Sequence, residues 1–296
     1  MDNHMSLRSK IFYKILVLKK LRGQFSKCME TGYDVMGKDK PSKLFLKGLN
    51  MNNEIFQGRN ITVLSKKKKP IGKTVIFIHG GAFVCQANTY HWDFITDFTR
   101  RTGATVYCLD YPLIPKYHSG AALRFVKRYY DYLSSTIDMD TLYIMGDSAG
   151  GGLTLSLLIE LRNEGLKLPK RAILLSPFLD INCNDDRQSI IEIKDPIIEL
   201  KDIRKIGKAY AGKLQLNDWK VSPLYDHLNH LCPISIYTSD CDTIHPDALR
   251  LKEKLERIEA KQKYYFEPGM VHDWMLFRVL PEGVKARKSI ADEVIS

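Results

Sequence analysis

The sequence predicts a single α/β domain built on a mostly parallel sheet. Short apolar runs typical of buried strands alternate with helical stretches along most of the chain, and this alternation gives parallel pairs with right-handed crossovers. The chain has 296 residues and 44% hydrophobic content, which is enough for one large core, and α/β folds of this size form one domain. We therefore expect a sheet of about eight strands with helices on both faces.

The N-terminal part of the chain is strongly basic. Residues 1–73 hold 17 Lys and Arg against 5 Asp and Glu, a difference of +12, whereas residues 74–296 hold 28 and 29, a difference of −1. Residues 9–21 predict a basic amphipathic helix, and its apolar run, residues 15–18, is far shorter than a ~20-residue membrane span. We expect this helix to pack on the core, and a weak contact with an anionic membrane surface is the alternative. Nucleic-acid binding is not expected, because the segment has no recognised binding motif.

The first buried strand, residues 73–78, leads into a His-Gly-Gly-Ala-Phe loop at residues 79–83. Paired glycines allow the chain to turn its backbone N–H groups toward a bound group. In acyl transfer, such N–H groups stabilise the negative charge that develops on the former carbonyl oxygen. An ordinary strand-end turn is the alternative. We expect the oxyanion donors to be the N–H groups of Gly81, Ala82 and, further along the chain, Ala149.

The next strands are expected at residues 105–109 and 142–145, and the second ends in the turn Gly146-Asp147-Ser148-Ala149-Gly150. An apolar helix follows at residues 153–161, so this G-x-S-x-G sequence lies between a strand and a helix. Such a turn strains the serine and exposes its hydroxyl, and the flanking glycines avoid collisions. A small-residue turn that lets a helix pack closely is the alternative. Ser148 is the candidate nucleophile.

Further strands are expected at residues 172–175, 235–237 and 263–266. The loop after the last of them holds His272, in a place from which a general base could reach a serine nucleophile. We expect surface or packing roles for His91, His118, His227, His230 and His245. His79 is expected to be a structural residue that braces its loop rather than a base.

Three aspartates after the strand at residues 235–237 compete for the role of the acid that orients the base: Asp240, Asp242 and Asp247. Such an acid holds the imidazole in the correct tautomer and stabilises the imidazolium. Spacing alone does not choose among the three. The chain order serine, aspartate, histidine is that of α/β hydrolases and differs from the orders in chymotrypsin and subtilisin.

These motifs together resemble the hormone-sensitive-lipase-like branch of the α/β-hydrolase esterases. The matching segments occur in family order and are residues 79–83, 109–115, 146–151, 176–180, 222–224 and the stretch around Asp242. The resemblance implies that Asp242 is the acid, although the family's Pro-Leu pair after it is Thr243-Ile244 here. The family's base is often followed by Gly-Phe, whereas His272 is followed by Asp273-Trp274.

The insertion between Leu179 and Ser222 contains a predicted helix at residues 197–206. In the resembled family this insertion and the N-terminal helices form a cap over the active site, and a plain surface helix is the alternative. The resemblance implies one domain over residues 1–296, with a helical cap from about residues 1–45 and about residues 182–216. A cap would exclude water and select substrates.

The six cysteines, at positions 28, 85, 108, 183, 232 and 241, form no C-x-x-C pair. Their pattern predicts reduced thiols in a cytoplasmic enzyme without a metal or cofactor.

The resemblance implies a serine carboxylesterase that cleaves small-molecule esters with short to medium acyl chains. Its reaction would proceed through Ser148, His272 and Asp242 and an acyl-enzyme intermediate. The alternatives are an amidase or formamidase, an interfacial lipase, and a non-catalytic receptor for small molecules. The oligomeric state stays open, with a homodimer as one option.

Overall fold

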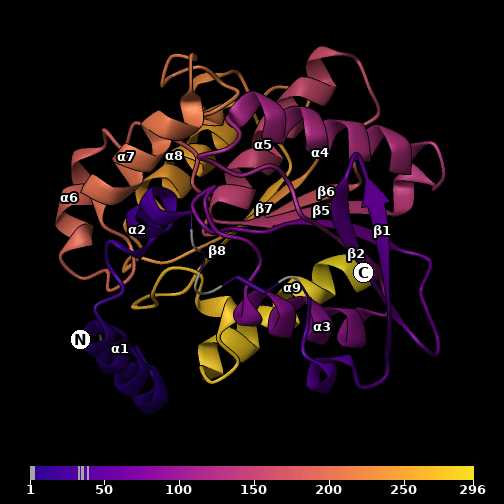
Figure 1. Ribbon diagram of the computed structural model, residues 1–296, viewed down its shortest axis with the longest axis horizontal. Helices are drawn as coiled ribbons and strands as arrows, with labels where there is room; N and C mark the ends of the chain where they lie inside the picture. Colours follow the sequence, from indigo (N-terminus) through magenta and orange to yellow (C-terminus); the bar gives the residue numbers. More distant parts are fainter. Residues whose placement is uncertain (1–3, 33, 35–36, 39) are drawn as a thin grey trace.

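The structure is a computed structural model that describes residues 4–32, 34, 37–38 and 40–296. Within them, eight strands form one sheet in the order β1-β2-β4-β3-β5-β6-β7-β8 (Figure 1). The strands are β1 (Leu49–Phe56), β2 (Arg59–Lys66), β3 (Thr74–Ile78), β4 (Thr105–Leu109), β5 (Leu142–Asp147), β6 (Arg171–Leu175), β7 (Ile234–Thr238) and β8 (Gln262–Phe266). β1 pairs with β2 and β2 with β4 in antiparallel fashion, and the other pairs are parallel.

Helices cover both faces of this sheet (Figure 1). α4 (Ser119–Ser134), α5 (Ala149–Asn163) and α8 (His245–Arg257) lie on one face, and α3 (Thr89–Thr102) and α9 (Pro281–Ile295) on the other. The strand β3 is buried along its whole length, because a parallel strand covered on both faces has no solvent side. Ile76 and Ile78 belong to the core that includes α5, and Val75 and Phe77 to the core that includes α3 and α9.

Four further helices lie beyond the strand ends: α1 (Leu7–Lys19), α2 (Gln24–Thr31), α6 (Asp186–Glu192) and α7 (Leu200–Ala211) (Figure 1). α2 packs on α7, and α1 packs on α9. Ser6 caps α1 by accepting a hydrogen bond from the N–H of Ser9 at 3.2 Å. The hydroxyls of Ser6 and Ser9 both donate to Glu282 of α9, at 3.1 and 2.6 Å, which ties α1 to the domain. These helices fall within the segments predicted to form the cap, of which residues 1–3, 33, 35–36 and 39 lie outside the described residues.

The predicted sheet of about eight mostly parallel strands, with helices on both faces, is confirmed. The antiparallel pair β1 and β2 was not among the strand runs expected from the sequence. The helix expected at residues 197–206 begins later, at Leu200, because the Asp195 carboxylate accepts the N–H groups of Ile197 and Ile198 and holds them in a turn. Among the helices described here, none is long and apolar enough to cross a bilayer.

Candidate active site

Ser148 lies at a sharp turn between β5 and α5. Its backbone angles, φ 49° and ψ −119°, fall in a region that side-chain-bearing residues rarely adopt. The N–H of Ser148 donates to the carbonyl oxygen of Leu175 at 2.8 Å, which fixes the turn against β6. A Cβ atom on Gly150 would lie 1.9 Å from the carbonyl oxygen of Ile78, so only glycine allows this approach of α5 to β3. The strained turn is the one that the sequence predicts for a nucleophile.

The loop after β3 turns back on itself beside Ser148. Gly81 has φ 106° and Ala82 has φ 52°, and the N–H groups of Val84 and Cys85 donate to the Gly81 carbonyl oxygen at 3.0 and 2.9 Å. A Cβ atom on Gly81 would meet the Cys85 carbonyl oxygen at 2.7 Å, so the tight loop requires glycine there. Within the described chain, the N–H groups of Gly81 and Ala82 have no recorded acceptor.

A third donor comes from the start of α5. Ala149 is the first residue of α5, and the N–H groups of a first helical turn have no partner inside the helix. The helix dipole adds a partial positive charge at this end. The N–H groups of Gly81, Ala82 and Ala149 are therefore suited to hold a negatively charged oxygen.

Two buried histidines, His79 and His91, lie beside this loop and form polar contacts there. The Tyr111 hydroxyl donates to the His79 carbonyl oxygen at 2.9 Å, and the two rings stack with centroids 4.6 Å apart. Burial, and the nearby His91, lower the pKa of His79 to about 4. Nε2 of His91 lies 2.9 Å from Oδ2 of Asp147. His91 is thus a buried polar partner of Asp147, the residue before Ser148, and the surface or packing role expected for it stays a prediction.

The loops after β7 and β8 lie side by side and carry the base and its acid. Cys241 and Val271 form an isolated parallel bridge that joins these loops. Nδ1 of His272 lies 2.9 Å from Oδ2 of Asp242, and both side chains are buried. The other carboxylate oxygen of Asp242 accepts the N–H of Ile244 at 3.1 Å. Asp242 is thus held in place to orient the imidazole.

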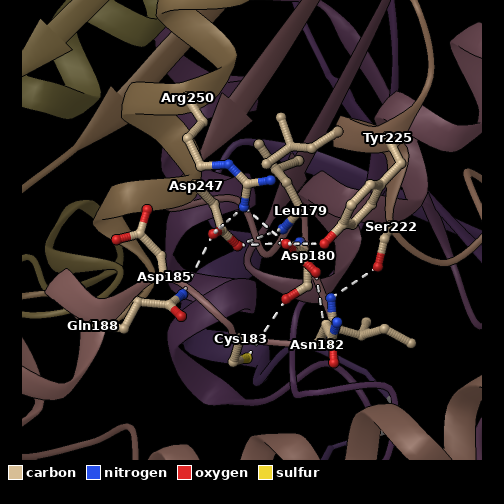
Figure 2. A network of polar contacts seen from close by, with 12 residues as sticks. Leu179, Asp180, Asn182, Cys183, Asp185, Gln188, Ser222, Tyr225, Asp247 and Arg250 are labelled. Carbon is tan, nitrogen blue, oxygen red and sulfur yellow. Dashed lines mark hydrogen bonds and ion pairs between the residues drawn. The ribbon is translucent and has the colours of Figure 1, made fainter. Parts of the chain in front are cut away.

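Neither of the other two candidate acids forms a recorded contact with His272. Asp240 accepts the N–H of Gly269 at 2.6 Å. Asp247 lies in α8 and accepts the N–H groups of Leu179 and Asp180 at 3.3 and 3.1 Å (Figure 2). Of the three aspartates, the structure brings only Asp242 to the imidazole.

Asp247 belongs instead to a buried polar network that links α8 to α6 (Figure 2). Gln188 of α6 donates to Oδ1 of Asp247 at 3.3 Å. Arg250 lies 2.8 Å from Oδ2 of Asp180 and 3.8 Å from Oδ1 of Asp247, and the Tyr225 hydroxyl donates to Asp180 at 3.1 Å. Burial, and then the charge of Asp180, raise the pKa of Asp247 well above its usual value. The guanidinium of Arg250 is therefore shared by two buried carboxylates, those of Asp180 and Asp247.

Asp273 contacts the base on its other side, a contact that was not foreseen from the sequence. Its Oδ2 lies 3.1 Å from Nε2 of His272, and its φ is 55°. Burial lowers the pKa of His272, but the charges of Asp242 and Asp273 outweigh burial and raise this pKa well above its usual value. Burial also raises the pKa of Asp273 to about 6, against the opposing effect of His272. No hydrogen bond is recorded between Ser148 and His272, both of which lie in the described chain.

One cavity of about 170 Å³ unites the predicted catalytic residues with the predicted cap. Ser148, His272 and Gly81 line it from the core. The N-terminal segment and the insertion contribute the apolar side chains Leu16, Leu21, Phe25 and Ile197. The lining thus combines polar side chains, among them Lys19 and Asn88, with these apolar ones, as in sites that bind small organic molecules.

The insertion also contacts the loop after β3 directly. The ring of Phe83 stacks on the ring of Tyr210 in α7, with centroids 3.6 Å apart and an interplanar angle of 8°. Phe83 follows Ala82 in the chain and shares its left-handed backbone conformation, with φ 61°. The stacking therefore connects α7 to the candidate oxyanion donors.

Among the described residues, one group has the composition of a metal site. One ligand atom each of Cys28, Asp34 and Cys85 lie within 4.8 Å of one another, and two sulfurs with a carboxylate are ligands that Zn²⁺ accepts. None of the predicted catalytic residues belongs to this group. All six cysteines are free thiols. The expectation that the enzyme needs no metal stays a prediction.

Comparison with known proteins agrees with this geometry. A family described as having the alpha/beta hydrolase fold matches residues 75–276. A protein named triacylglycerol lipase from Mycobacterium tuberculosis is 31% identical over 210 residues, covering 70% of this chain and 43% of the lipase. A protein named esterase from Acinetobacter venetianus is 29% identical over 221 residues, covering 74% of this chain and 73% of the esterase.

Two further matches concern the hormone-sensitive-lipase-like branch of the family and the fold. Mus musculus hormone-sensitive lipase is 26% identical over 145 residues, covering 47% of this chain and 19% of the lipase. The crystal structure of EstE5 soaked in ethyl alcohol matches with a TM-score of 0.86 and 26% identity, covering 98% of each chain. The chain thus spans less than half of each of the two lipases and nearly the whole of EstE5.

Proposed function

The chain belongs to the alpha/beta hydrolase fold family, in its hormone-sensitive-lipase-like esterase branch, and we propose that it hydrolyses carboxylic esters with short to medium acyl chains. The observation that carries this proposal is the meeting of three features in one cavity. These are the strained Ser148, His272 with Asp242 behind it, and the loop of Gly81, whose N–H group has no recorded acceptor among the described residues.

The proposed reaction begins with attack by the Ser148 hydroxyl on the ester carbonyl. His272 accepts the hydroxyl proton at Nε2, while Asp242 holds Nδ1 and stabilises the imidazolium. The N–H groups of Gly81, Ala82 and Ala149 stabilise the tetrahedral oxyanion, each contributing about a hundredfold to a thousandfold in rate.

The intermediate then collapses to an acyl-enzyme. His272 returns the proton to the leaving alcohol, and a water that His272 activates hydrolyses the acyl-enzyme. Nε2 of His272 must exchange its contact with Asp273 for one with Ser148 before the first step.

The size and lining of the cavity support the proposed acyl range. A volume of about 170 Å³ is below the roughly 300–1,000 Å³ of pockets that hold drug-sized ligands. The apolar side chains that line it favour an alkyl group over a charged one. A long acyl chain would have to extend out through the opening between the core and the predicted cap.

Replacement of the nucleophile tests the proposal. Ser148→Ala is expected to lower kcat on a chromogenic short-chain ester by about four to six orders of magnitude. Ser156→Ala, in the same helix, is the matched control, because the Ser156 hydroxyl donates to the Trp219 carbonyl oxygen away from the cavity. Retained turnover in Ser148→Ala would contradict the assignment. A panel of esters from short to long acyl chains, each with its amide counterpart, separates esterase from amidase activity.

An interfacial lipase is the second candidate function. The name of the Mycobacterium tuberculosis relative and the exposed leucines of α1 favour it. A rate that rises sharply above the micellar threshold of the substrate would support this candidate over a simple esterase. A rate that follows ordinary saturation through that threshold would exclude it.

A further inference from the structure

Helix α1 is fixed to the domain by one of its faces. Ser9 and Leu16 are buried on this face, and the ring of Phe12 packs on Phe277 with centroids 4.9 Å apart. The hydrogen bonds of the Ser9 hydroxyl to Glu282 add a polar anchor. The helix therefore has a defined orientation on the domain, and its opposite face points outward.

The outward face is apolar. Leu7, Ile11, Ile15 and Leu18 expose 74%, 51%, 42% and 79% of their surface. At about 100° per residue, these four positions fall within an arc of about 80°, on the side of the helix opposite Leu16. We call them the apolar stripe. Four large aliphatic side chains in a row on one exposed face mark a site of interaction rather than scattered surface residues.

Cationic side chains border the apolar stripe on both sides. In helical projection, Lys10 and Lys14 lie along one edge, and Arg8 and Lys19 lie along the other. None of the four takes part in an ion pair recorded among the described residues. The sequence has no Asp or Glu from position 3 to position 29, so no acidic side chain of this segment neutralises them.

We propose that α1 docks the protein on the surface of an anionic lipid bilayer. The apolar stripe would enter the interface between headgroups and acyl chains, and the bordering cations would contact the headgroups. A helix with an apolar face and basic edges, too short to span, binds membranes in this orientation. The inference goes beyond the proposed ester hydrolysis and does not depend on it.

Charge argues against the other occupants of this surface. Two copies that paired stripe against stripe would bring eight border cations together without an acidic partner on either helix, and this repulsion opposes a dimer. The phosphates of a nucleic acid would pair with the bordering cations, but the aliphatic side chains of the apolar stripe would stay exposed to water. A bilayer that contains acidic lipids satisfies both the apolar stripe and its cationic border.

The position of α1 relates the docked surface to the candidate active site. Leu16 and Lys19 line the same cavity as Ser148, and they lie on the turns of α1 that carry Ile15 and Leu18. Val17 and the 79% exposed Ile193 line a neighbouring surface cavity, together with the charged Lys20, Arg22 and Asp195. The cavity of Ser148 lies against the face of α1 opposite the apolar stripe, so docking would place it behind α1, about one helix diameter of 10–12 Å from the bilayer surface.

Vesicle co-sedimentation of the full chain tests the proposal. We expect the protein to sediment with phosphatidylcholine vesicles that contain phosphatidylglycerol, and at least about tenfold less with pure phosphatidylcholine. High salt should weaken the binding, because it screens the cations. The double variant Leu7→Ser, Leu18→Ser should lose at least about tenfold in partitioning, since it removes the two most exposed members of the apolar stripe.

The double variant Ile55→Ser, Leu166→Ser is the matched control, because it removes exposed aliphatic side chains from β1 and from the loop after α5, outside α1. It should bind the acidic vesicles as the original chain does. All variants should keep the circular dichroism spectrum and the melting temperature of the original chain, which shows that they fold. The proposal is wrong if the original chain does not sediment with acidic vesicles, or if the stripe variant sediments equally well. It is also wrong if the stripe variant only converts a dimer to a monomer.

Discussion

Oδ2 of Asp273 lies 3.1 Å from Nε2 of His272, the nitrogen that must receive the proton of Ser148 in the proposed reaction. The imidazole is thus held between two carboxylates, with Asp242 at 2.9 Å on the other nitrogen. Two negative partners stabilise the imidazolium, so His272 retains its proton at a pH where an ordinary histidine is neutral. The proposed base, His272, is therefore contacted at its proton-accepting nitrogen by the residue that follows it in the chain.

The first prediction concerns pH. Only neutral His272 can accept a proton, so activity should rise as pH increases through the raised pKa of His272. Asp273→Asn removes one of the two charges that raise this pKa, and the acidic limb of the kcat/KM profile should move to lower pH. The measurement is kcat/KM on a short-chain ester across the acidic and neutral range.

Other titrating groups face the same site and define the control. Asp147, paired with His91, and Asp242 act on Asp273, and the buried Asp195 interacts with Asp242 and His272. Asp240→Asn removes a nearby carboxylate that contacts Gly269 instead, and it should leave the profile in place. The kcat/KM profile of Asp273→Asn should shift only if Asp273 contacts His272 when the proton is accepted. An unchanged profile would show that the Asp273 carboxylate has moved away from Nε2 before His272 accepts the proton of Ser148.

The second prediction separates the candidate acids. Asp242→Asn should lower kcat by about 10,000-fold, because the amide stabilises the wrong tautomer of His272. Asp240→Asn should change kcat by no more than a few-fold, since Asp240 only accepts a backbone N–H. Steady-state kinetics on one ester compares the two variants directly. A reversed order of effects would transfer the role of the acid to Asp240.

The third prediction concerns the turn at Ser148. Gly150→Ala places a Cβ atom 1.9 Å from the Ile78 carbonyl oxygen, and backbone of both β3 and α5 must move to avoid it. We expect a loss of about 3 kcal/mol or more in the free energy of unfolding, or no folded protein. Gly120→Ala is the control, because in α4 the new methyl group meets only the flexible end of Arg124 at 3.2 Å. It should stabilise the helix by up to about 1 kcal/mol, and urea denaturation measures both variants.

The fourth prediction concerns the network in Figure 2. Arg250→Met leaves the buried carboxylates of Asp180 and Asp247 without their shared cation. We expect the free energy of unfolding to fall by about 3 kcal/mol at neutral pH. The variant should recover part of this loss in acid. Burial raises the folded-state pKa of Asp247 above its unfolded value, so the folded state gains from protonation of Asp247 and loses stability as pH rises.

Arg187→Met serves as the control for this network. Its partner Asp185 lies at 2.6 Å, but the Arg187 side chain is 47% exposed, and exposed ion pairs contribute only about 0–1 kcal/mol. Urea denaturation at acidic and neutral pH compares the two variants. Equal, pH-independent losses would mean that Arg250 acts only through packing of its aliphatic part.

Much of the fold and the placement of Ser148 could be predicted because the information is local. A strained strand-to-helix turn needs small residues beside the serine. The glycines around Ser148 meet this requirement and can be recognised directly in the sequence. The same holds for the central strands, where β3 and β5 are continuous apolar runs. β1 lacked such a pattern because it is an edge strand with mostly exposed or half-buried side chains.

The contacts of side chains across the site could not be predicted in this way. The chain order left Asp240, Asp242 and Asp247 open, because which carboxylate faces His272 depends on how the loops after β7 and β8 lie together. Asp273 was visible in the sequence only as a departure from the Gly-Phe pair of the family. Its contact with Nε2 follows from its positive φ, which a sequence pattern does not report.

The stacking of Phe83 on Tyr210 has a consequence for the loop that follows β3. Because Phe83 directly follows Ala82, any outward movement of α7 pulls on the segment that carries the oxyanion donors. A substitution that removes the Tyr210 ring should therefore disturb the loop of the candidate oxyanion donors, although Tyr210 lies on another helix.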